Sequence, residues 1–536
     1  MSGPGVRQLW RSGEPFIWLT GGALALALIM VAALIAVIVV NGLGFFWPAP
    51  VVRLELRDGK VLTGPIVERE SIPGRGATRI KVKVANRDLY GADFVWIEES
   101  QVVARALPVD VAVIERTEWG DLIGTITALR DGDRVVASGP GAWDEARRRL
   151  RASARLRAEI RRVERQDIGA INHAQEQARL QLRGLELRGV TTGAAVEALQ
   201  GRVDELQERY KAQETRLAEL RARQTDALVV AADGGKDKVV PLAQVVDVTY
   251  PNRMGIGAKT VHYARKLWQF VSDDPRESNT EGGVFPAIFG TVMMVMIMSI
   301  MVTPLGVLAA FYLREYARQG PFVSAVRIAV NNLAGVPSIV FGVFGVGFFI
   351  YVVGGSLDRL FFAEALPTPT FGTGGILWAS LTLALLTIPV VIVATEEGLA
   401  AIPGGTREAS LALGATKLET TLRVVLPAVM PSVLTGLILA MARAAGEVAP
   451  LMLTGVVKLA PSLPIDGTWP FVHLDRKFMH LGFHIYDVGF QSPNVDAARP
   501  MVFMTTLLLL GIVVCLNLFA ITMRNRLRRK YATAAV

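Results

Sequence analysis

Cysteine is nearly absent from this chain of 536 residues, and histidine is scarce. The one cysteine, Cys515, lies inside an apolar stretch, so no disulfide can form within the chain and no cysteine-based zinc site is possible. Three of the five histidines fall between residues 473 and 484. His480 and His484 have the i, i+4 spacing of two ligands on one helix face, but no third ligand accompanies them. We therefore expect no metal site.

Charged residues are missing from long apolar stretches. Hydrophobic residues make up 51% of the chain and its mean hydropathy is +0.38, which is typical of a protein that is partly embedded in a membrane. A transmembrane helix needs about 20 apolar residues. Six stretches reach this length: residues 16–40, 284–313, 328–353, 371–395, 428–457 and 500–523. The first has a longer apolar core than a signal peptide, so we interpret it as an anchor.

Acidic residues are fewer than basic ones, 48 against 57, and the net charge is +9. Such an excess suits either nucleic-acid binding or the positive-inside bias of membrane loops. If both termini are cytoplasmic, one side of the membrane receives four basic sets: Arg7 and Arg11; Arg314, Arg318 and Arg327; Arg407, Lys417 and Arg423; Arg524, Arg526, Arg528, Arg529 and Lys530. Topology therefore explains the charge. We expect a multi-pass protein of the bacterial inner membrane with both termini in the cytoplasm and no nucleic-acid partner.

With this topology, residues 42–283 lie in the periplasm, after a first domain of residues 1–41. Short strands alternate with turns there, as in residues 52–62 around Asp58-Gly59, and this pattern is typical of β-hairpins. A row of mostly apolar residues then recurs at a spacing of three to four, which is typical of a coiled-coil seam: Val196, Leu199, Val203, Leu206, Tyr210, Gln213, Leu217 and Leu220. We predict β-rich parts at 50–141 and 227–251, with an antiparallel coiled-coil hairpin at 142–226 inserted between them.

The remaining residues, 284–536, are predicted to form a membrane core of five spans. Its most specific segment is the cytoplasmic loop 396–427, which has the pattern of a short helix, a glycine (Gly414) that permits a sharp turn, and a second helix that Pro427 stops. A rigid helix–turn–helix of this kind suits docking to another protein. An ordinary polar loop is the alternative.

This loop resembles the EAA loop of ABC importer permeases. Glu408 and Ala409 match the acid–alanine pair, Gly414 follows six residues after the glutamate, and Leu426-Pro427 match the end of the motif. Ser410 stands where the family usually has a second alanine. The resemblance implies that the loop docks in a groove of a separate ATPase subunit.

Two charges interrupt the fifth apolar stretch. Arg443 and Glu447 lie at i, i+4 spacing, and a charge at the centre of a bilayer costs about 2.5–3.5 kcal/mol on insertion scales. One interpretation is that the Arg443 guanidinium binds an anion while Glu447 holds it in place or competes with that anion. The other is a structural ion pair that locks the helix bundle.

Around these charges the sequence resembles the PstA-type permease of bacterial phosphate ABC importers. Residues 332–342, Asn-Leu-Ala-Gly-Val-Pro-Ser-Ile-Val-Phe-Gly, are similar to one signature of that family, and residues 442–451 are similar to another. The resemblance covers roughly residues 284–530. It does not cover the outer segment, because typical members join the first two spans by a much shorter loop.

The resemblance implies a substrate pathway and a set of partners. Arg443, Glu447, Asn332 and Ser338 would line the phosphate route, and Gly335 and Pro337 would break the third span beside it, although a plain kink at Pro337 is an alternative. The partners would be a PstC-type paralogous permease, two cytoplasmic ATPase subunits and a periplasmic phosphate-binding protein. The chain has no Walker A motif, so ATP and Mg would be bound by the ATPase subunits, and this chain would hold no cofactor.

The sequence thus predicts an α-helical polytopic membrane protein with six transmembrane helices, an ABC importer type I-like core and a large periplasmic α+β insertion. Its predicted function is that of a permease subunit, not an enzyme, in an ATP-driven phosphate importer. Two alternatives remain at this stage. One is a permease for another oxyanion or small solute, and the other is a membrane-anchored periplasmic scaffold or sensor built around the hairpin.

Overall fold

The computed structural model describes residues 13–74, 76–492 and 495–532, so Arg7 and Arg11 lie outside the described residues. Six described helices are long and apolar enough to cross a membrane, which makes the chain a polytopic helical membrane protein, as predicted. These helices are α2 (Glu14–Gly44); α8 (Phe285–Phe311); α10 (Ser338–Phe344) continued by η8 (Gly345–Gly354) and α11 (Gly355–Phe361); α12 (Ile376–Ala401); α14 (Lys417–Thr420) continued by η10 (Thr421–Val425) and α15 (Leu426–Gly446); and α18 (Val495–Ala532).

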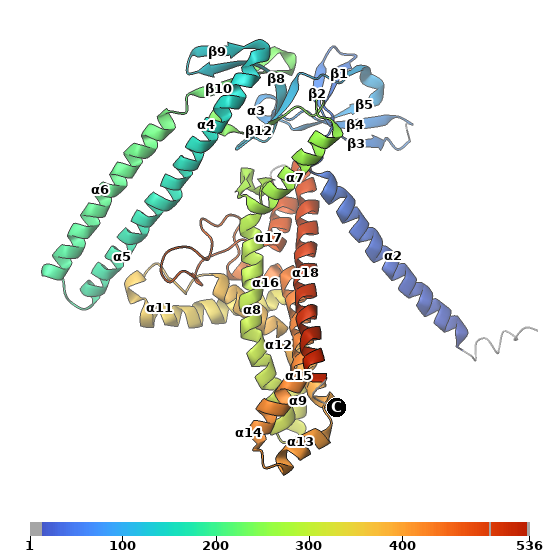
Figure 1. Ribbon diagram of the computed structural model, residues 1–536, viewed down its shortest axis with the longest axis vertical. Helices are drawn as coiled ribbons and strands as arrows, with labels where there is room; N and C mark the ends of the chain where they lie inside the picture. Colours follow the sequence, from blue (N-terminus) through green and yellow to red (C-terminus); the bar gives the residue numbers. More distant parts are fainter. Residues whose placement is uncertain (1–12, 75, 493–494, 533–536) are drawn as a thin grey trace, which may run out of the picture.

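The centre of the membrane part is α12, which packs between α8 and α15 and buries Leu383, Ala384 and Val391 completely. Its buried hydroxyls bond within the helix: Thr387 donates to the Leu383 carbonyl at 2.8 Å and Thr395 to the Val391 carbonyl at 2.7 Å. This local bonding removes the cost of a hydroxyl in an apolar core. Figure 1 shows α8, α12 and α18 running along the long axis, while α2 contacts α18 near its C-terminal end and its N-terminal part lies away from the bundle.

The expected bounds of the third span, 328–353, are wrong. Helix α9 (Pro321–Leu333) ends inside that range, and the apolar helix begins again at Ser338 and continues to Phe361. Pro337 accounts for the break, because its ring disfavours helical geometry in the preceding residue and its own ψ of 135° is extended. Apolar residues continue on both sides, so hydropathy does not reveal this break.

The expected end of the fifth span, at residue 457, is also wrong. Helix α15 ends at Gly446, and a separate short helix, α16 (Ala449–Thr454), follows. Glycine is a poor helix former, and Pro450 occupies the first turn of α16, where its missing N–H costs nothing. These two residues together favour a stop and a new start.

The segment between α2 and α8, called the outer segment, contains four antiparallel sheets in its described residues: two of three strands, one of six, and the two-stranded sheet of β13 (Pro275–Arg276) and β14 (Glu281–Gly282). The three-stranded sheets are β2-β1-β6, with β1 (Val52–Leu56), β2 (Val61–Gly64) and β6 (Val102–Ala106), and β3-β4-β5, with β3 (Ile66–Ser71), β4 (Thr78–Lys83) and β5 (Phe94–Glu98). The large sheet has β7 (Val111–Arg116), β8 (Leu122–Asp131), β9 (Arg134–Ser138), β10 (Asp226–Ala232), β11 (Lys236–Pro241) and β12 (Val245–Thr249). In the first hairpin, Leu54 faces Leu62 and Gly59 has a φ of +80°, which explains the glycine at that turn.

Two long helical arms leave the large sheet. They are formed by α4 (Ala142–Arg162), η3 (Val163–Asp167) and α5 (Ile168–Leu187), and by α6 (Ala194–Ala222). Strands β9 and β10 on either side both pair with β8, so the arms are an insertion in one sheet. The arms are held together by Ile160, Val163, Leu217 and Leu220 and by a hydrogen bond of 3.1 Å between Gln175 and Gln207.

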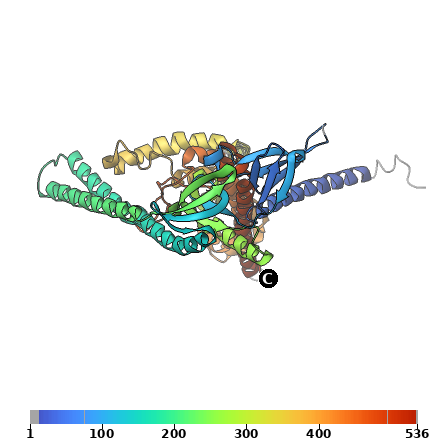
Figure 2. The ribbon, with the colours of Figure 1, turned by 90° about the horizontal axis from the view of Figure 1, so that it is seen from above.

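Figures 1 and 2 show the two arms running antiparallel to each other and projecting sideways from the large sheet. Helix α5 contacts the short turn η9 (Ala363–Ala365) that follows α11. Residue Arg165 also bonds to Asp274 at 2.5 Å, next to the start of the membrane core. The hairpin therefore lies over an outer loop of the core.

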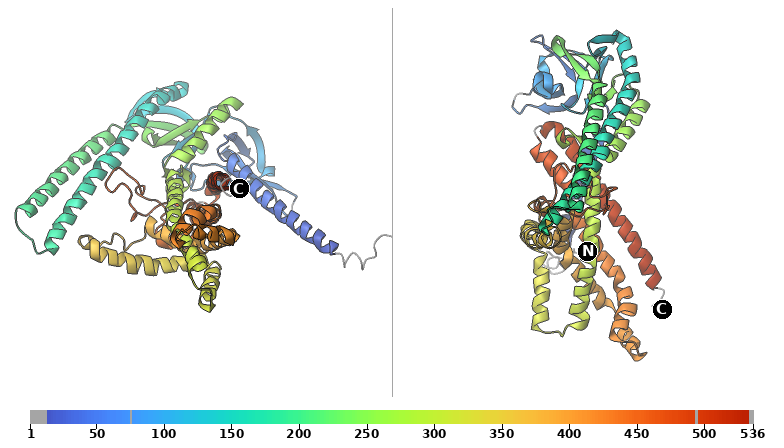
Figure 3. Two further views of the ribbon diagram at one scale, coloured as in Figure 1. Left: turned by 60° about the horizontal axis from the view of Figure 1, so that its bottom comes forward. Right: turned by 90° about the vertical axis from the view of Figure 1, so that its left-hand side faces the viewer.

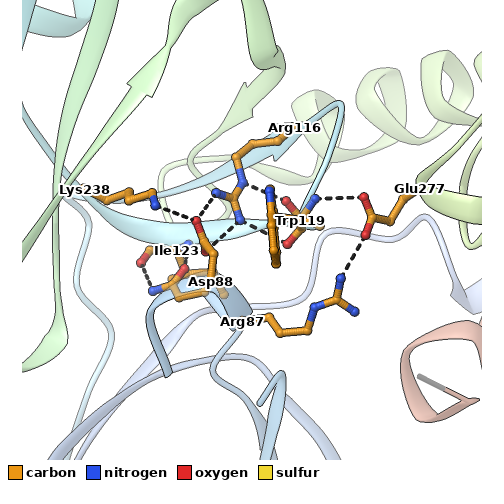
Figure 4. Close-up of polar contacts among 9 residues, drawn as sticks. Arg87, Asp88, Arg116, Trp119, Ile123, Lys238 and Glu277 are labelled. Atoms are coloured by element: carbon orange, nitrogen blue, oxygen red, sulfur yellow. Dashed lines mark hydrogen bonds and ion pairs between the residues drawn. The ribbon is translucent and has the colours of Figure 1, made fainter. Parts of the chain in front are cut away.

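A short connector joins the β-strands to α8. It consists of α7 (Ile256–Ser272), β13 (Pro275–Arg276), η6 (Glu277–Asn279) and β14 (Glu281–Gly282). Figure 4 shows Glu277 accepting hydrogen bonds from Arg87 Nη2 at 2.9 Å, on α3 (Arg87–Tyr90), and from the Trp119 backbone N–H at 2.8 Å. Two residues later, Asn279 donates to the Lys458 carbonyl at 2.8 Å in the core. The connector is thus bonded to both parts of the molecule.

The same close-up shows how α3 is fixed beneath the large sheet. Asp88 pairs with Arg116 at 2.9 Å and with Lys238 at 3.0 Å, and both Asp88 and Arg116 side chains are almost fully buried. A direct ion pair of 2.9 Å between Lys81 of β4 and Asp496 of α18 adds a further link to the core. The Asp88 pairs thus fix α3 within the outer domain, and the Lys81–Asp496 pair ties that domain to a membrane helix.

Candidate functional site

The two signature segments of the sequence meet in the structure. Helix α10 crosses α16 at Gly342, where an added Cβ would lie only 2.7 Å from the Pro450 Cα. One turn further, an added Cβ on Gly345 would lie 2.4 Å from Thr382 Oγ1 and 2.9 Å from Thr454 Cγ2. Only glycine fits such close approaches, to backbone at Gly342 and to threonine side chains at Gly345. The break before Ser338 and the break after Gly446 thus lie on elements that pack directly on one another.

Arg443 and Glu447 lie at the second break. Arg443 is in the last turn of α15, and Glu447 follows the final residue of that helix with an extended backbone. The distance from Arg443 Nε to Glu447 Oε1 is 3.6 Å, which is an ion pair but too long for a good hydrogen bond. Their side chains are 34% and 21% exposed, so they are partly open in this single chain. The guanidinium keeps donors for an additional anionic partner.

The helix end itself favours an arginine. Unpaired carbonyls at a helix C-terminus carry partial negative charge, and a cation in the last turn stabilises the helix there. A second anion at this place would then be held chiefly by the guanidinium, since the helix end repels it. Arg443 is for this reason the central residue of the candidate site.

The other residues predicted for this site lie at the first break. Asn332 is in the last turn of α9, its side chain is exposed, and its carbonyl accepts the Gly335 N–H at 3.0 Å. Pro337 caps the start of α10, and Ser338 is the first residue of that helix. Among the described residues, no hydrogen bond or ion pair joins Asn332 or Ser338 to Arg443 or Glu447. The structure therefore brings the segments together without linking these polar side chains.

The loop predicted to be cytoplasmic, residues 396–427, forms a compact helix–turn–helix. Helix α13 (Gly404–Ala412) is followed by Gly414, whose φ of +87° suits glycine alone among common residues. A capping box of Thr416 and Glu419 then starts the second helix. The prediction that Pro427 stops this helix is wrong, because the helix continues from Lys417 to Gly446. The wide π turn η10 comes just before Pro427 and relieves the clash that a proline makes with the preceding turn.

Polar contacts that sequence reasoning missed hold this loop on the bundle. Arg407 pairs with Glu315 at 2.8 Å, and Lys417 donates to the Glu315 carbonyl at 2.6 Å. Glu315 lies in η7 (Tyr312–Tyr316), at the end of α8. The hydroxyls of Ser410 and Thr420 are buried and 2.9 Å apart, which joins the two helices of the loop. The serine at position 410 was the visible signal, since it replaces an alanine of the motif.

The far side of the loop exposes apolar side chains. Leu413 is 89% exposed and Leu418 is 60% exposed, and Glu408 and Ala409 are also exposed. The loop lies at the opposite end of the molecule from the β-strands (Figure 3). Large apolar side chains exposed on such a projection are typical of a protein-binding site. Leu426 and Pro427, by contrast, are partly buried where α15 enters the bundle.

His480 and His484 are buried in the fold. His480 caps α17 (Leu481–Tyr486) by accepting the Gly482 N–H at 3.1 Å, and both His480 and His484 are buried. Burial lowers the pKa of His480 to about 3 and that of His484 to about 4, so both are neutral near pH 7. Within the part of the chain that the structure describes, no group of three or more His, Cys, Asp or Glu residues is arranged to hold a metal ion.

Comparison with known proteins agrees with the resemblance. Residues 302–530 match the family described as the binding-protein-dependent transport system inner membrane component. A phosphate transport system permease protein PstA of Mycobacterium leprae is 38% identical over 172 residues, which are 32% of this chain and 51% of that protein. PstA 1 of Mycobacterium tuberculosis is 37% identical over 185 residues, 34% of this chain and 54% of that protein.

A third relative is more distant but matches over a greater length. The probable ABC transporter permease protein YqgI of Bacillus subtilis is 28% identical over 235 residues, 43% of this chain and 74% of that protein. The chain spans about half the length of the mycobacterial relatives that it matches. The family match contains both helix breaks and the helix–turn–helix loop but none of the outer β-strands. Residues 302–530 are therefore similar to the binding-protein-dependent transport system inner membrane components, and the predicted resemblance of this chain to PstA-type permeases is confirmed.

Proposed function

We propose that this chain is the transmembrane permease subunit of an ATP-driven importer that carries inorganic phosphate across the bacterial inner membrane. The observation that carries the proposal is sequence similarity to proteins named as phosphate transport system permeases: 172 residues of the chain are 38% identical to one of them and 185 residues are 37% identical to another. Both termini are cytoplasmic in this proposal, and residues 42–283 are periplasmic. The chain itself does not hydrolyse ATP.

The phosphate pathway passes the two helix breaks in this proposal. Arg443 binds the anion, because a guanidinium offers several donors in a planar arrangement that matches phosphate oxygens. Glu447 orients Arg443 when the site is empty and competes with phosphate for it. Asn332 and Ser338 supply further polar contacts at the first break, and Gly335 and Pro337 keep that break open. The ion pair of 3.6 Å supports this role, because it is loose enough for an anion to replace.

In this proposal, the cytoplasmic loop couples ATP hydrolysis to transport. Two ATPase subunits, which hold ATP and Mg, dock on the exposed surface around Glu408, Ala409 and Gly414. The loop continues without interruption into α15, so Lys417 and Arg443 belong to one helix of 30 residues, about 45 Å long. A displacement of the loop by the ATPase therefore moves the end of α15 that carries Arg443, and this couples ATP hydrolysis to access at the site.

Two further partners complete the proposed importer. A PstC-type paralogous permease subunit faces the exposed side of the two breaks, and a periplasmic phosphate-binding protein delivers the anion. The partly exposed state of Arg443 and Glu447 in this single chain supports a second subunit that closes the pathway.

Substrate-selective uptake tests the proposal. The whole complex is reconstituted in proteoliposomes with ATP inside. Uptake of labelled phosphate and of labelled sulfate is measured in parallel, with the binding protein for each anion added outside. We expect ATP-dependent uptake of phosphate and none of sulfate. Uptake of sulfate alone would leave a permease of the same family but refute phosphate as its substrate.

A further inference from the structure

Helix α7 has three different faces, although it is only 17 residues long. One face is polar and turns toward the β-strands: Lys266 pairs with Glu115 of β7 and, at 3.1 Å, with Asp247 of β12. A second face is apolar and packs on the outer ends of the membrane helices, with Phe270 buried and Leu267 and Val271 beside it. These two faces fix both the position and the rotation of α7.

The third face is unpartnered and apolar. Val261 is 61% exposed and Trp268 is 71% exposed. At 3.6 residues per turn, Val261 and Trp268 lie about 140° and 160° around the helix from Lys266. They therefore point away from the β-strands. Arg265 lies next to them, is exposed, and makes no ion pair or hydrogen bond with the described residues.

The depth of α7 is set by the end of the first membrane helix. Helix α2 ends at Gly44 and is followed by Phe45, Phe46 and Trp47. Phe46 packs on Phe270 of α7 with ring centres 5.4 Å apart, and Trp47 packs on Tyr263 of α7 at 6.2 Å. Aromatic residues at the end of a membrane helix lie at the level of the lipid headgroups. Helix α7 shares that level, and Figure 1 shows it between the β-strands and the ends of α8 and α18.

We propose that α7 lies on the bilayer surface, with Val261 and Trp268 inserted among the lipid headgroups and the Arg265 guanidinium beside lipid phosphates. Three observations carry this inference: the level of α7 beside an aromatic end of α2, the rotation fixed by Lys266, and the large apolar side chains on the face opposite to the β-strands. Large apolar side chains beside a basic residue are typical of helices that lie in the plane of a membrane surface. The helix then orients the whole outer domain relative to the membrane, because it also carries the ion pairs to β7 and β12. The inference does not depend on the transported substrate.

Accessibility of labelled positions tests the inference. In the assembled complex, reconstituted in vesicles of zwitterionic and anionic phospholipid, Cys515 is replaced by serine and a single cysteine is introduced as Val261→Cys, Trp268→Cys or Val239→Cys. Val239 of β11 is the matched control, since it is an exposed apolar residue of the outer domain that lies away from α7. Each cysteine receives a nitroxide label, and its collisions with oxygen and with a water-soluble nickel chelate are compared.

We expect oxygen to collide more often than the nickel chelate at positions 261 and 268, and the reverse at position 239. Nickel accessibility at 261 and 268 equal to that at 239 would overturn the inference, because these residues would then face water. Protection from both reagents would overturn it too, because another protein would then cover this face.

A second measurement requires no label at these positions. Tryptophan emission of the complex is compared between ordinary and brominated lipids for the unmodified chain, for Trp268→Phe, and for Trp119→Phe as a control in the outer domain. We expect the bromine-dependent loss of emission to be smaller in Trp268→Phe than in the unmodified chain and unchanged in Trp119→Phe. An unchanged loss in Trp268→Phe would refute insertion of this side chain among the lipids.

Discussion

Gly342 allows α10 and α16 to pack closely at the candidate site. An added Cβ at this position would lie 2.7 Å from Pro450 Cα and 3.1 Å from Leu453 Cδ1, so Gly342→Ala forces α10 and α16 apart. Overpacking of this kind costs roughly 1–3 kcal/mol. We expect a lower midpoint of thermal unfolding for the complex and slower phosphate uptake, both measured on the same preparation.

The control for this substitution is Gly347→Ala. Gly347 lies in the same apolar helix, and nothing stands within 4 Å of an added Cβ there. Alanine raises the helix propensity equally in both variants. The difference between their unfolding midpoints therefore measures the close contact of α10 with α16 alone. Equal unfolding midpoints in the two variants would show that α10 and α16 do not approach so closely.

Glu281 makes the connector between the outer domain and α8 sensitive to pH. Burial, together with the nearby carboxylates of Asp121 and Glu115, raises the pKa of Glu281 to about 8. Between its ordinary pKa near 4.5 and this value, the folded state binds more protons than the unfolded state. Stability from this group is therefore complete below pH 4.5 and is lost as pH rises toward 8, by at most about 1.4 kcal/mol per pH unit.

Glu281→Gln tests this loss of stability with rising pH, because glutamine resembles the protonated carboxyl and does not ionise. Hydrogen exchange of residues 275–284 is followed at pH 5.5 and at pH 8.5. We expect similar exchange in both chains at pH 5.5 and faster exchange in the unmodified chain at pH 8.5. Identical exchange in the two chains at pH 8.5 would contradict a raised pKa of Glu281, because its ionisation would then not destabilise the connector.

At the scale of elements, the helix–turn–helix loop carries the proposed contact with the ATPase. Leu413 is 89% exposed, so Leu413→Asp leaves folding almost unchanged, within about 0.5 kcal/mol, but places a charge in the apolar surface. We expect at least a tenfold loss of ATPase subunits that copurify with the membrane part, which corresponds to about 1.4 kcal/mol. Leu187→Asp, at an exposed leucine of the outer hairpin, is the control and is expected to retain them.

Some helix bounds can be predicted from the sequence and others cannot. The membrane helices follow from apolar length, and the break at Pro337 follows from proline chemistry. The end of α15 was missed because the apolar sequence continues past Gly446, although Gly446 and Pro450 favour a stop and a new start. The continuation through Pro427 was missed because a π turn has no sequence signal of its own. The Arg407–Glu315 pair joins residues 92 apart, a distance that local patterns do not bridge.

At the scale of the whole molecule, the outer hairpin and the membrane core are separate parts with separate roles in our account. The family match covers neither arm of the hairpin, and the arms face each other near Gln175 and Gln207. Replacing residues 170–210 by a short glycine–serine linker keeps Ile160, Val163, Leu217 and Leu220 in contact. We expect this chain to assemble and to take up phosphate at nearly the rate of the intact complex.

Uptake assays in cells that lack the native importer provide this measurement, with assembly checked by copurification of the ATPase. A chain that assembles but no longer transports would contradict the separation of roles. It would also favour the interpretation in which the hairpin is the working part of the protein.

The central claim is that Arg443 binds the transported anion, and ATP-dependent phosphate uptake by Arg443→Ala tests it most directly. The double variant Arg443→Ala/Glu447→Ala is measured beside it, because removal of both partners relieves a merely structural ion pair. Our account predicts that uptake falls at least tenfold in Arg443→Ala, equivalent to about 1.4 kcal/mol, and stays low in the double variant while the complex assembles. Uptake at the unmodified rate in Arg443→Ala, or its recovery in the double variant, would contradict the account and leave Arg443 a structural residue.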